Sequence, residues 1–317
     1  RGWKVRVFFA TDVHGSSLVW RKWLRSAEVY GADVLVMAGD LTGKVLVPIV
    51  RRGDEYHARY FGRKWRLRGE AEVSAFEERL EGAGAYYVRV TDSELEELRS
   101  KPELVEKLMH EKIVERLRLW LEQAVEEARA EVRVVVMPGN DDDFFVDEVL
   151  REFEDRVTTT PLGGVEELGG HEILSSPYVN PTPWRTPREM AEEELEKHLR
   201  ALASELDRPE RAVFNLHCPP HGTNLDIAPK LDRSLRPVVI GGVVLTEHVG
   251  SVAVRRVLED VRPLVGLHGH IHESSGVDRV GGTVVLNPGS EYSEGILRGY
   301  VVELRGGELG GYWRVEG

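Results

Sequence analysis

Residues 5–14 read Val-Arg-Val-Phe-Phe-Ala-Thr-Asp-Val-His and join a short apolar run to a polar cluster. Apart from Arg6, the run Val5–Ala10 is apolar and rich in β-branched and aromatic residues. Such runs are typical of strands in a sheet that is covered on both faces. Asp12 and His14 follow the run directly, and in open α/β sheets the functional site lies at the carboxyl ends of the strands. The stretch therefore predicts a buried strand that presents site residues at its end.

The same arrangement recurs along the chain. Five further apolar runs are predicted to be core strands: Val34–Ala38, Val132–Met137, Ala212–Leu216, Pro263–Leu267 and Thr283–Leu286. Each is followed at once by polar residues, among them Gly-Asp, Pro-Gly-Asn-Asp, His-Cys-Pro-Pro, His-Gly-His-Ile-His and Asn-Pro-Gly-Ser. Polar clusters at the ends of all these strands predict one site that is assembled from distant parts of the sequence.

Helical patterns occupy much of the intervening sequence. Ser100 and Glu103 form a capping-box pattern, which predicts a long amphipathic helix from this point. Thr186 and Glu189 form a second such pattern and predict a Glu-rich helix near 187–206. Between the second and third predicted strands, the alternation around Gly62 predicts a hairpin.

Composition excludes several classes of protein. The 317 residues include 42 basic and 54 acidic side chains, for a net charge of −12, and 41% are hydrophobic. This balance indicates a folded soluble protein rather than a disordered chain. The longest apolar run, Val238–Leu245, is far shorter than the roughly 18 residues of a membrane span, so we expect no membrane association. A single cysteine, Cys218, excludes an internal disulfide framework and a Cys-rich metal site.

Two weaker expectations concern the protein's environment. The printed sequence does not open with a basic and then apolar leader, so we expect a cytoplasmic location. The chain is rich in charge and contains one glutamine, Gln123, which fits a thermophile, although a GC-rich genome would also favour arginine.

The polar clusters carry a specific set of motifs. A lone strand-end Asp or His is most simply a helix cap or a satisfied buried side chain, and an Asp-x-His pair arises by chance about 0.5 times in this composition. A Gly-His-x-His pattern is expected only about 0.04 times. The joint pattern favours a functional site over isolated structural residues, because every block directly follows a predicted strand. The blocks are Asp12-x-His14, Gly39-Asp40, Gly139-Asn140-Asp141, His217 and Gly269-His270-x-His272.

This series of blocks resembles the calcineurin-like metallophosphoesterases, whose motifs run D-x-H, G-D, G-N-H-[DE], H and G-H-x-H. The resemblance covers roughly residues 4–43 and 131–290. It implies an α/β fold, a layered α/β sandwich with two facing mixed β-sheets flanked by helices. Residues 44–130 lie outside it, and we expect them to form a helical and hairpin insertion at about 44–130 within a single domain of residues 1–317. The sequence leaves the oligomeric state open.

The resemblance also implies two divalent metal ions. By family analogy, one would be held by Asp12, His14, Asp40 and His272, and the other by Asp40, Asn140, His217 and His270. Asp40 would bridge the two ions, and a hydroxide bound by both would act as the nucleophile. Mixed nitrogen and oxygen ligands suit Mn, Fe, Zn, Co or Ni, and the sequence does not choose among them.

One block departs from the family pattern. Asp141 stands where the family commonly has a histidine that contacts the phosphoryl group. A carboxylate there would repel an anionic phosphate unless it is protonated, rotated away or hydrogen-bonded elsewhere. We therefore interpret Asp141 either as a catalytic acid or as a group that orients metal ligands. His221 is a substitute candidate for the acid, with an ordinary surface histidine as the alternative.

The leading functional prediction is a metal-dependent hydrolase of a small phosphoester, with a diester favoured over a monoester. A nuclease of the same superfamily is the first alternative, because basic and aromatic residues interleave between Arg51 and Arg68. The net charge of −12 disfavours a nucleic-acid partner. The second alternative is a non-catalytic metal-binding partner protein.

Overall fold

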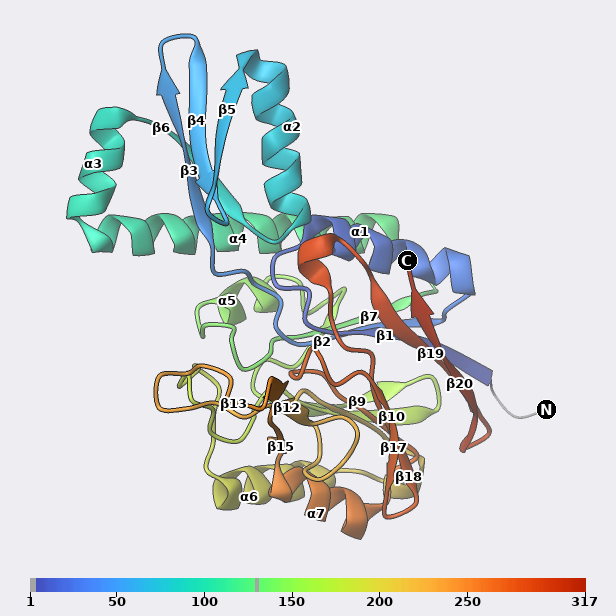
Figure 1. Ribbon diagram of the computed structural model, residues 1–317. Coiled ribbons are helices and arrows are strands. Elements are labelled where there is room, and N and C mark those ends of the chain that lie inside the picture. The colour runs from blue at the N-terminus through green and yellow to red at the C-terminus, as the bar shows by residue number, and fades with distance from the viewer. Residues whose placement is uncertain (1–3, 129–130) are drawn as a thin grey trace.

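Two six-stranded mixed sheets form the centre of the molecule (Figure 1). The computed structural model describes residues 4–128 and 131–317. The first sheet has the strand order β20 (Glu308–Glu316), β19 (Arg298–Arg305), β1 (Lys4–Ala10), β2 (Val34–Ala38), β7 (Arg133–Met137) and β8 (Thr158–Thr159). The second has the order β17 (Gly276–Val280), β18 (Thr283–Asn287), β16 (Val265–Leu267), β11 (Val213–Leu216), β10 (His171–Ser176) and β9 (Gly164–Leu168).

Strand β1 shows why the predicted strands are nearly continuous apolar runs. Val5, Val7 and Phe9 point into the core between the two sheets, where they share a cluster with residues of β16 and β18. Phe8 and Ala10 point the other way, into a second core beneath the helices. Both faces of the strand are therefore buried, as the sequence predicted.

Helices cover the outer faces of both sheets. On the first sheet lie α1 (Ser17–Tyr30), α4 (Pro102–Glu127) and α5 (Val146–Arg151), and on the second lie α6 (Glu192–Ala203) and α7 (Val252–Val261). Figure 1 shows α1 and α4 on one side of the paired sheets and α6 and α7 on the other. The prediction of a layered α/β sandwich with two facing mixed sheets is confirmed. Among the described residues, no helix has both the length and the apolar character needed to cross a membrane.

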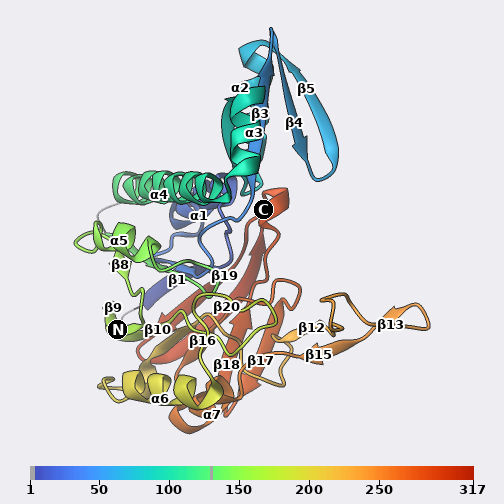
Figure 2. The same cartoon turned by 90° about the vertical axis from the view of Figure 1, so that its left-hand side faces the viewer.

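Between β2 and α4 the chain leaves the sandwich and builds a smaller unit that projects from it (Figures 1 and 2). Its elements are β3 (Leu46–Arg52), β4 (Glu55–Tyr60), β5 (Arg63–Arg68), α2 (Gly69–Gly82), β6 (Tyr86–Thr91) and α3 (Asp92–Ser100). The strands form a sheet in the order β5-β4-β3-β6, and β4 and β5 make the predicted hairpin at Gly62. The assignment of residues 44–130 as an insertion in one domain stays a prediction, and residues 129 and 130 lie outside the described part.

The interleaved basic and aromatic residues of this unit lie partly on opposite faces of its sheet. Tyr56, Tyr60 and Trp65 belong to the apolar cluster that packs against α2. By strand alternation, Arg59 and Lys64 lie on the opposite face. Arg63 lies on the same face as Trp65, with its guanidinium carbon 4.3 Å from the centre of the Trp65 ring. That ring also packs against Phe76 of α2, so its contacts lie within the unit.

Both predicted helix starts differ from the structure. Ser100 ends α3, and α4 begins at Pro102 after Lys101, which makes no side-chain cap. The capping box of this region belongs to Thr91 and Glu94 at the start of α3. The Glu-rich helix begins only at Glu192. The predicted start is wrong because the backbone of residues 188–190 pairs with Val179, whose N–H donates to the Arg188 carbonyl and whose carbonyl accepts from the Met190 N–H.

A narrow arm leaves the second sheet after β11 (Figure 2). It comprises β12 (Ile227–Pro229), β13 (Val239–Ile240), β14 (Val243–Val244) and β15 (Thr246–His248), in which β12 pairs with β15 and β13 with β14. Two short 3₁₀ helices complete the described elements, η1 (Pro209–Arg211) and η2 (Tyr292–Glu294).

Candidate metal centre

The carboxyl ends of parallel strands from both sheets meet at one place. The first sheet supplies the residues after β1, β2 and β7, and the second supplies those after β11 and β16. The structure brings together all the residues predicted as metal ligands: Asp12, His14, Asp40, Asn140, His217, His270 and His272.

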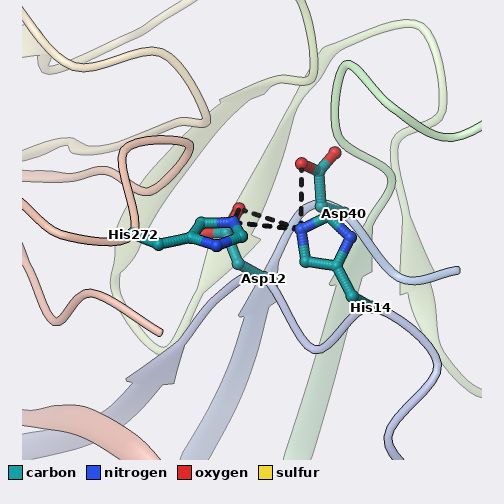
Figure 3. Close-up of side chains that lie close together, drawn as sticks. All are labelled: Asp12, His14, Asp40 and His272. Carbon is teal, nitrogen blue, oxygen red and sulfur yellow. Dashed lines mark hydrogen bonds and ion pairs between the residues drawn. The ribbon is translucent and has the colours of Figure 1, made fainter. Parts of the chain in front are cut away.

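The first group of donors is Asp12, His14, Asp40 and His272, whose ligand atoms all lie within 4.8 Å of one another (Figure 3). The Nε2 atoms of His14 and His272 are 3.0 Å apart. His272 Nε2 lies 3.2 Å from Asp12 Oδ1, and His14 Nε2 lies 3.5 Å from Asp40 Oδ2. Two imidazole nitrogens and two carboxylates therefore point toward one small volume.

The second group is Asp40, His217 and His270, again within 4.8 Å, so Asp40 belongs to both groups. His217 Nε2 lies 3.4 Å from Asp40 Oδ2 and 3.0 Å from Asn140 Oδ1. His217 Nδ1 donates to the Ala38 carbonyl at 2.8 Å, which fixes the ring with Nε2 toward the site. The Asn140 amide donates to Thr186 Oγ1 at 2.9 Å, and this bond turns its oxygen toward His217.

Two glycines of the motifs are required by close packing. A Cβ atom on Gly39 would overlap the His217 ring, and Gly39 also has a φ of 109°. A Cβ atom on Gly139 would overlap the Asp40 carboxylate and its backbone nitrogen. The glycines therefore let the loops approach the donors closely.

The backbone is strained at several of the donors themselves. Asp12, His14, Asp40 and His270 have φ angles of 55°, 39°, 49° and 68°, in the left-handed region that non-glycine residues rarely adopt. Each such residue costs on the order of 1–3 kcal/mol, and residues of this kind concentrate at functional sites. The fold therefore holds these side chains in place at a cost to its stability.

Asp142 is a functional residue that the sequence analysis missed. It is fully buried, and its carboxylate accepts hydrogen bonds from the backbone N–H groups of Leu41, Thr42 and Gly139 and from the Thr42 hydroxyl. It thereby ties the loop that carries Asp40 to the loop that carries Asn140. Asp142 thus positions the loops that carry two candidate ligands, and the orienting role considered for Asp141 stays a prediction.

Asp141 itself faces the donor cluster. Its backbone N–H donates to Asp40 Oδ1 at 2.9 Å, and its carboxylate lies 3.8 Å from Lys44 Nζ with 29% of the side chain exposed. Burial and the Asp40 charge raise the pKa of Asp141 to about 7. The catalytic role of Asp141 stays a prediction.

His221, the other candidate acid, lies on a cleft beside the donors. Its side chain is 43% exposed, and its Nδ1 lies 3.8 Å from the buried carboxylate of Asp226. His270 and His272 line the same cleft. A ligand bound at the donor cluster could therefore extend along this cleft to His221.

Three further residues contact the donors and were not assigned roles from the sequence. The Tyr292 ring lies 4.8 Å from the His14 ring, and no motif pointed to it. Ser290 Oγ donates to the Asp12 carbonyl at 2.7 Å, and its position directly after a core strand was the available signal. Thr11 Oγ1 donates to Asp12 Oδ2 at 2.6 Å and orients that carboxylate.

The electrostatics of the site are those of closely packed carboxylates and imidazoles. Burial alone would lower the pKa of His217, but Asp40 and Asp12 raise it to about 9. Burial opposes ionisation of Asp40, but His217 and His14 hold its pKa well below the usual range. Burial and His217 lower the pKa of His270 to about 4. These residues fit a divalent cation, because a cation would satisfy the carboxylates and the converging imidazole nitrogens together.

Comparisons with known proteins extend this description. No family model matches the sequence. A protein of Methanocaldococcus jannaschii, "Uncharacterized protein MJ1162", is 30% identical over 160 residues, which are 50% of this chain and 64% of that protein. This chain thus spans just under two thirds of the length of that relative.

Two crystal structures match almost the whole chain. One aligns over 99% of both chains with a TM-score of 0.60 and 16% identity. The crystal structure of TT1561 of Thermus thermophilus aligns over 94% of both chains with a TM-score of 0.52 and 13% identity. This chain shares their fold. At such low identity the likeness concerns the fold alone.

Proposed function

We propose that this chain is a metal-dependent phosphoesterase of the calcineurin-like metallophosphoesterase superfamily. The observation that carries the proposal is the pair of donor groups that share Asp40. Together with Asn140, these groups contain every residue of the motifs that resemble the family's metal ligands.

The two groups assign a role to each donor. Asp12, His14, Asp40 and His272 would hold one divalent ion, and Asp40, Asn140, His217 and His270 a second. When bound, such ions activate a water molecule and neutralise the charge of the phosphoryl oxygens. The chain fixes the donors through Asp142, through the bond from His217 to Ala38 and through the bond from Asn140 to Thr186.

We propose a phosphodiester rather than a monoester as the substrate. Asp141 places a carboxyl group where the family commonly supplies an imidazole donor to the phosphoryl group. A monoester dianion would lose that partner, whereas a diester carries one negative charge fewer. Asp141 and His221 are the two candidates for delivering a proton to the leaving oxygen.

The alternative functions have less support. A nuclease needs a surface that follows a polyanion, but the chain carries a net charge of −12, and the rings of the projecting unit pack toward α2. A non-catalytic partner protein would not need all seven donors, which the structure brings together. A small phosphoester therefore remains the favoured substrate.

The test is hydrolysis of bis-p-nitrophenyl phosphate and of p-nitrophenyl phosphate by Mn²⁺-loaded protein. We expect kcat/KM to be at least about tenfold higher for the diester than for the monoester. A tenfold ratio corresponds to about 1.4 kcal/mol of transition-state stabilisation. A clear preference for the monoester would contradict the diester assignment. Absence of turnover of both esters with Mn²⁺, Zn²⁺, Co²⁺ and Ni²⁺ would overturn the enzymatic function.

A further inference from the structure

A cleft of about 590 Å³ opens directly beside the candidate metal centre. His270 and His272 line it at the end nearest the donors. One wall is the proline-rich loop that carries Trp184, and the other is the arm of β12–β15. We call this space the Trp184 cleft, and a ligand held at the metal centre would extend into it.

The walls of the Trp184 cleft are largely apolar, and the tryptophan is unusually open. Trp184 is 62% exposed, although its ring is among the largest apolar surfaces a protein can present. Pro181 and Pro183 flank it, and Leu231 and Leu235 of the arm line the same cleft. These residues offer a flat ring on one side and aliphatic groups on the other, a combination suited to a ring-shaped ligand.

The loop that carries Trp184 is held in place. Asn180 Nδ2 donates to the Val249 carbonyl at 3.2 Å, which ties the start of the loop to the arm. The Trp184 backbone N–H donates to Thr182 Oγ1, which in turn donates to Glu189. An exposed ring on a fixed loop binds a ligand with a small loss of conformational entropy.

The charge of the cleft restricts what else the ligand can carry. Three carboxylates, Asp232, Glu247 and Glu273, line it, and among the described residues that line it none is Lys or Arg. Asp232 accepts from the backbone N–H groups of Ser234 and Arg236. A fourth carboxylate, Glu192, is engaged by backbone N–H groups at the start of α7. A second phosphate or carboxylate on the ligand would meet this negative wall, so the cleft disfavours a group that carries a negative charge.

The polar groups in the cleft are fixed by a buried carboxylate. Asp226 is fully buried and accepts from His248 Nδ1 at 2.8 Å and from the backbone N–H groups of Thr223 and Gly250. His221 lies beside it, with its ring centre 5.8 Å from that of His248. Both imidazoles line the cleft and supply hydrogen-bonding groups between the apolar walls.

We infer that the Trp184 cleft selects the substrate: it binds the uncharged ring-bearing ester group of a phosphodiester whose phosphate lies at the metal centre. This inference rests on the proposed function for the position of the phosphate. Trp184 is a specificity residue that stacks on the ring, and the acidic wall discriminates against esters with a further negative charge.

The test compares diphenyl phosphate, dimethyl phosphate and bis(4-carboxyphenyl) phosphate with Mn²⁺-loaded protein, as competitors of bis-p-nitrophenyl phosphate hydrolysis or, if no ester is hydrolysed, by calorimetric binding. Diphenyl phosphate is expected to bind about tenfold more tightly than dimethyl phosphate, which has the same charge but no ring. Trp184→Ala should remove this advantage, while Trp313→Ala, on β20, should preserve it. Because Trp184 is exposed, its removal should leave the thermal unfolding temperature unchanged.

The acidic wall of the cleft is tested with a ligand that carries further negative charge. Bis(4-carboxyphenyl) phosphate, which carries a carboxylate on each ring, should bind more weakly than diphenyl phosphate, and Glu247→Lys should narrow this difference in affinity by about two- to fivefold. Equal binding of the two esters by the wild type would overturn this part.

The outcomes separate the inference from the proposed function. If diphenyl phosphate binds equally well to Trp184→Ala and wild-type protein while bis-p-nitrophenyl phosphate is hydrolysed, the cleft assignment is wrong and the function stands. If no ester is hydrolysed but diphenyl phosphate binding still depends on Trp184, the cleft is a binding site and the proposed function fails.

Discussion

Replacing Asp40 with asparagine is expected to lower kcat/KM for bis-p-nitrophenyl phosphate by about 10³-fold or more at saturating Mn²⁺, a loss of about 4 kcal/mol. Asp40 is the one donor that belongs to both groups. Its Oδ2 faces the Nε2 atoms of His14 and His217 at 3.5 and 3.4 Å. An amide supplies no charge to either group and cannot bridge two cations as a carboxylate does.

The matched control for this variant is Asp54→Asn, which makes the same chemical change in an exposed turn of the projecting unit. Its activity should equal that of the wild type. The measurement is kcat/KM of the wild type, Asp40→Asn and Asp54→Asn across a range of Mn²⁺ concentrations. If Asp40→Asn kept more than a tenth of the wild-type kcat/KM, the shared role of Asp40 would be wrong.

Replacing Arg188 with methionine is expected to reduce the free energy of unfolding by about 3–5 kcal/mol, because it leaves buried polar groups without partners. The Arg188 side chain is 0% exposed and pairs with Asp147 at 2.6 Å. Its guanidinium also donates to the carbonyls of Asp142, Pro161 and Asp143. The bonds to Asp142 and Asp143 hold the loop behind Asn140, so apparent Mn²⁺ affinity should fall as well.

Urea unfolding checks this prediction, with Arg118→Met as the control. Arg118 also makes a two-bond ion pair, with Glu152, but its side chain is 41% exposed. Its replacement should cost less than about 1 kcal/mol, since exposed ion pairs contribute little. Similar losses for the two variants would contradict the structural role given to Arg188. The double variant Arg188→Met/Asp147→Leu should recover part of the loss, because it also removes the unpaired carboxylate.

The strands of the two sheets were predictable because a strand that is buried on both faces appears in the sequence as a nearly continuous apolar run. The run Val34–Ala38 was predicted with the bounds that the structure gives to β2. The candidate ligands were predictable because each follows such a strand, and the ends of parallel strands meet in one place. Their close approach also depends on Gly39 and Gly139, which belong to the same motifs.

Other features could not be predicted because they depend on contacts between distant residues. Asp141 and Asp142 are adjacent carboxylates, and no periodicity shows which one turns toward Leu41 and which toward the donors. Arg188 fits a helix start in sequence, but the carbonyls that its side chain contacts lie 27 to 46 positions away. The Trp184 cleft exists only because the β12–β15 arm lies opposite the proline-rich loop.

The central claim is that the two donor groups hold two metal ions in one site, and metal counting tests it most directly. The protein should be dialysed against Mn²⁺, freed of excess ion, and analysed by mass spectrometry of the metal and by electron paramagnetic resonance. The account predicts two Mn²⁺ ions per chain with the spectrum of a magnetically coupled pair. A single ion per chain at saturation, or two ions with the spectrum of isolated Mn²⁺, would contradict it.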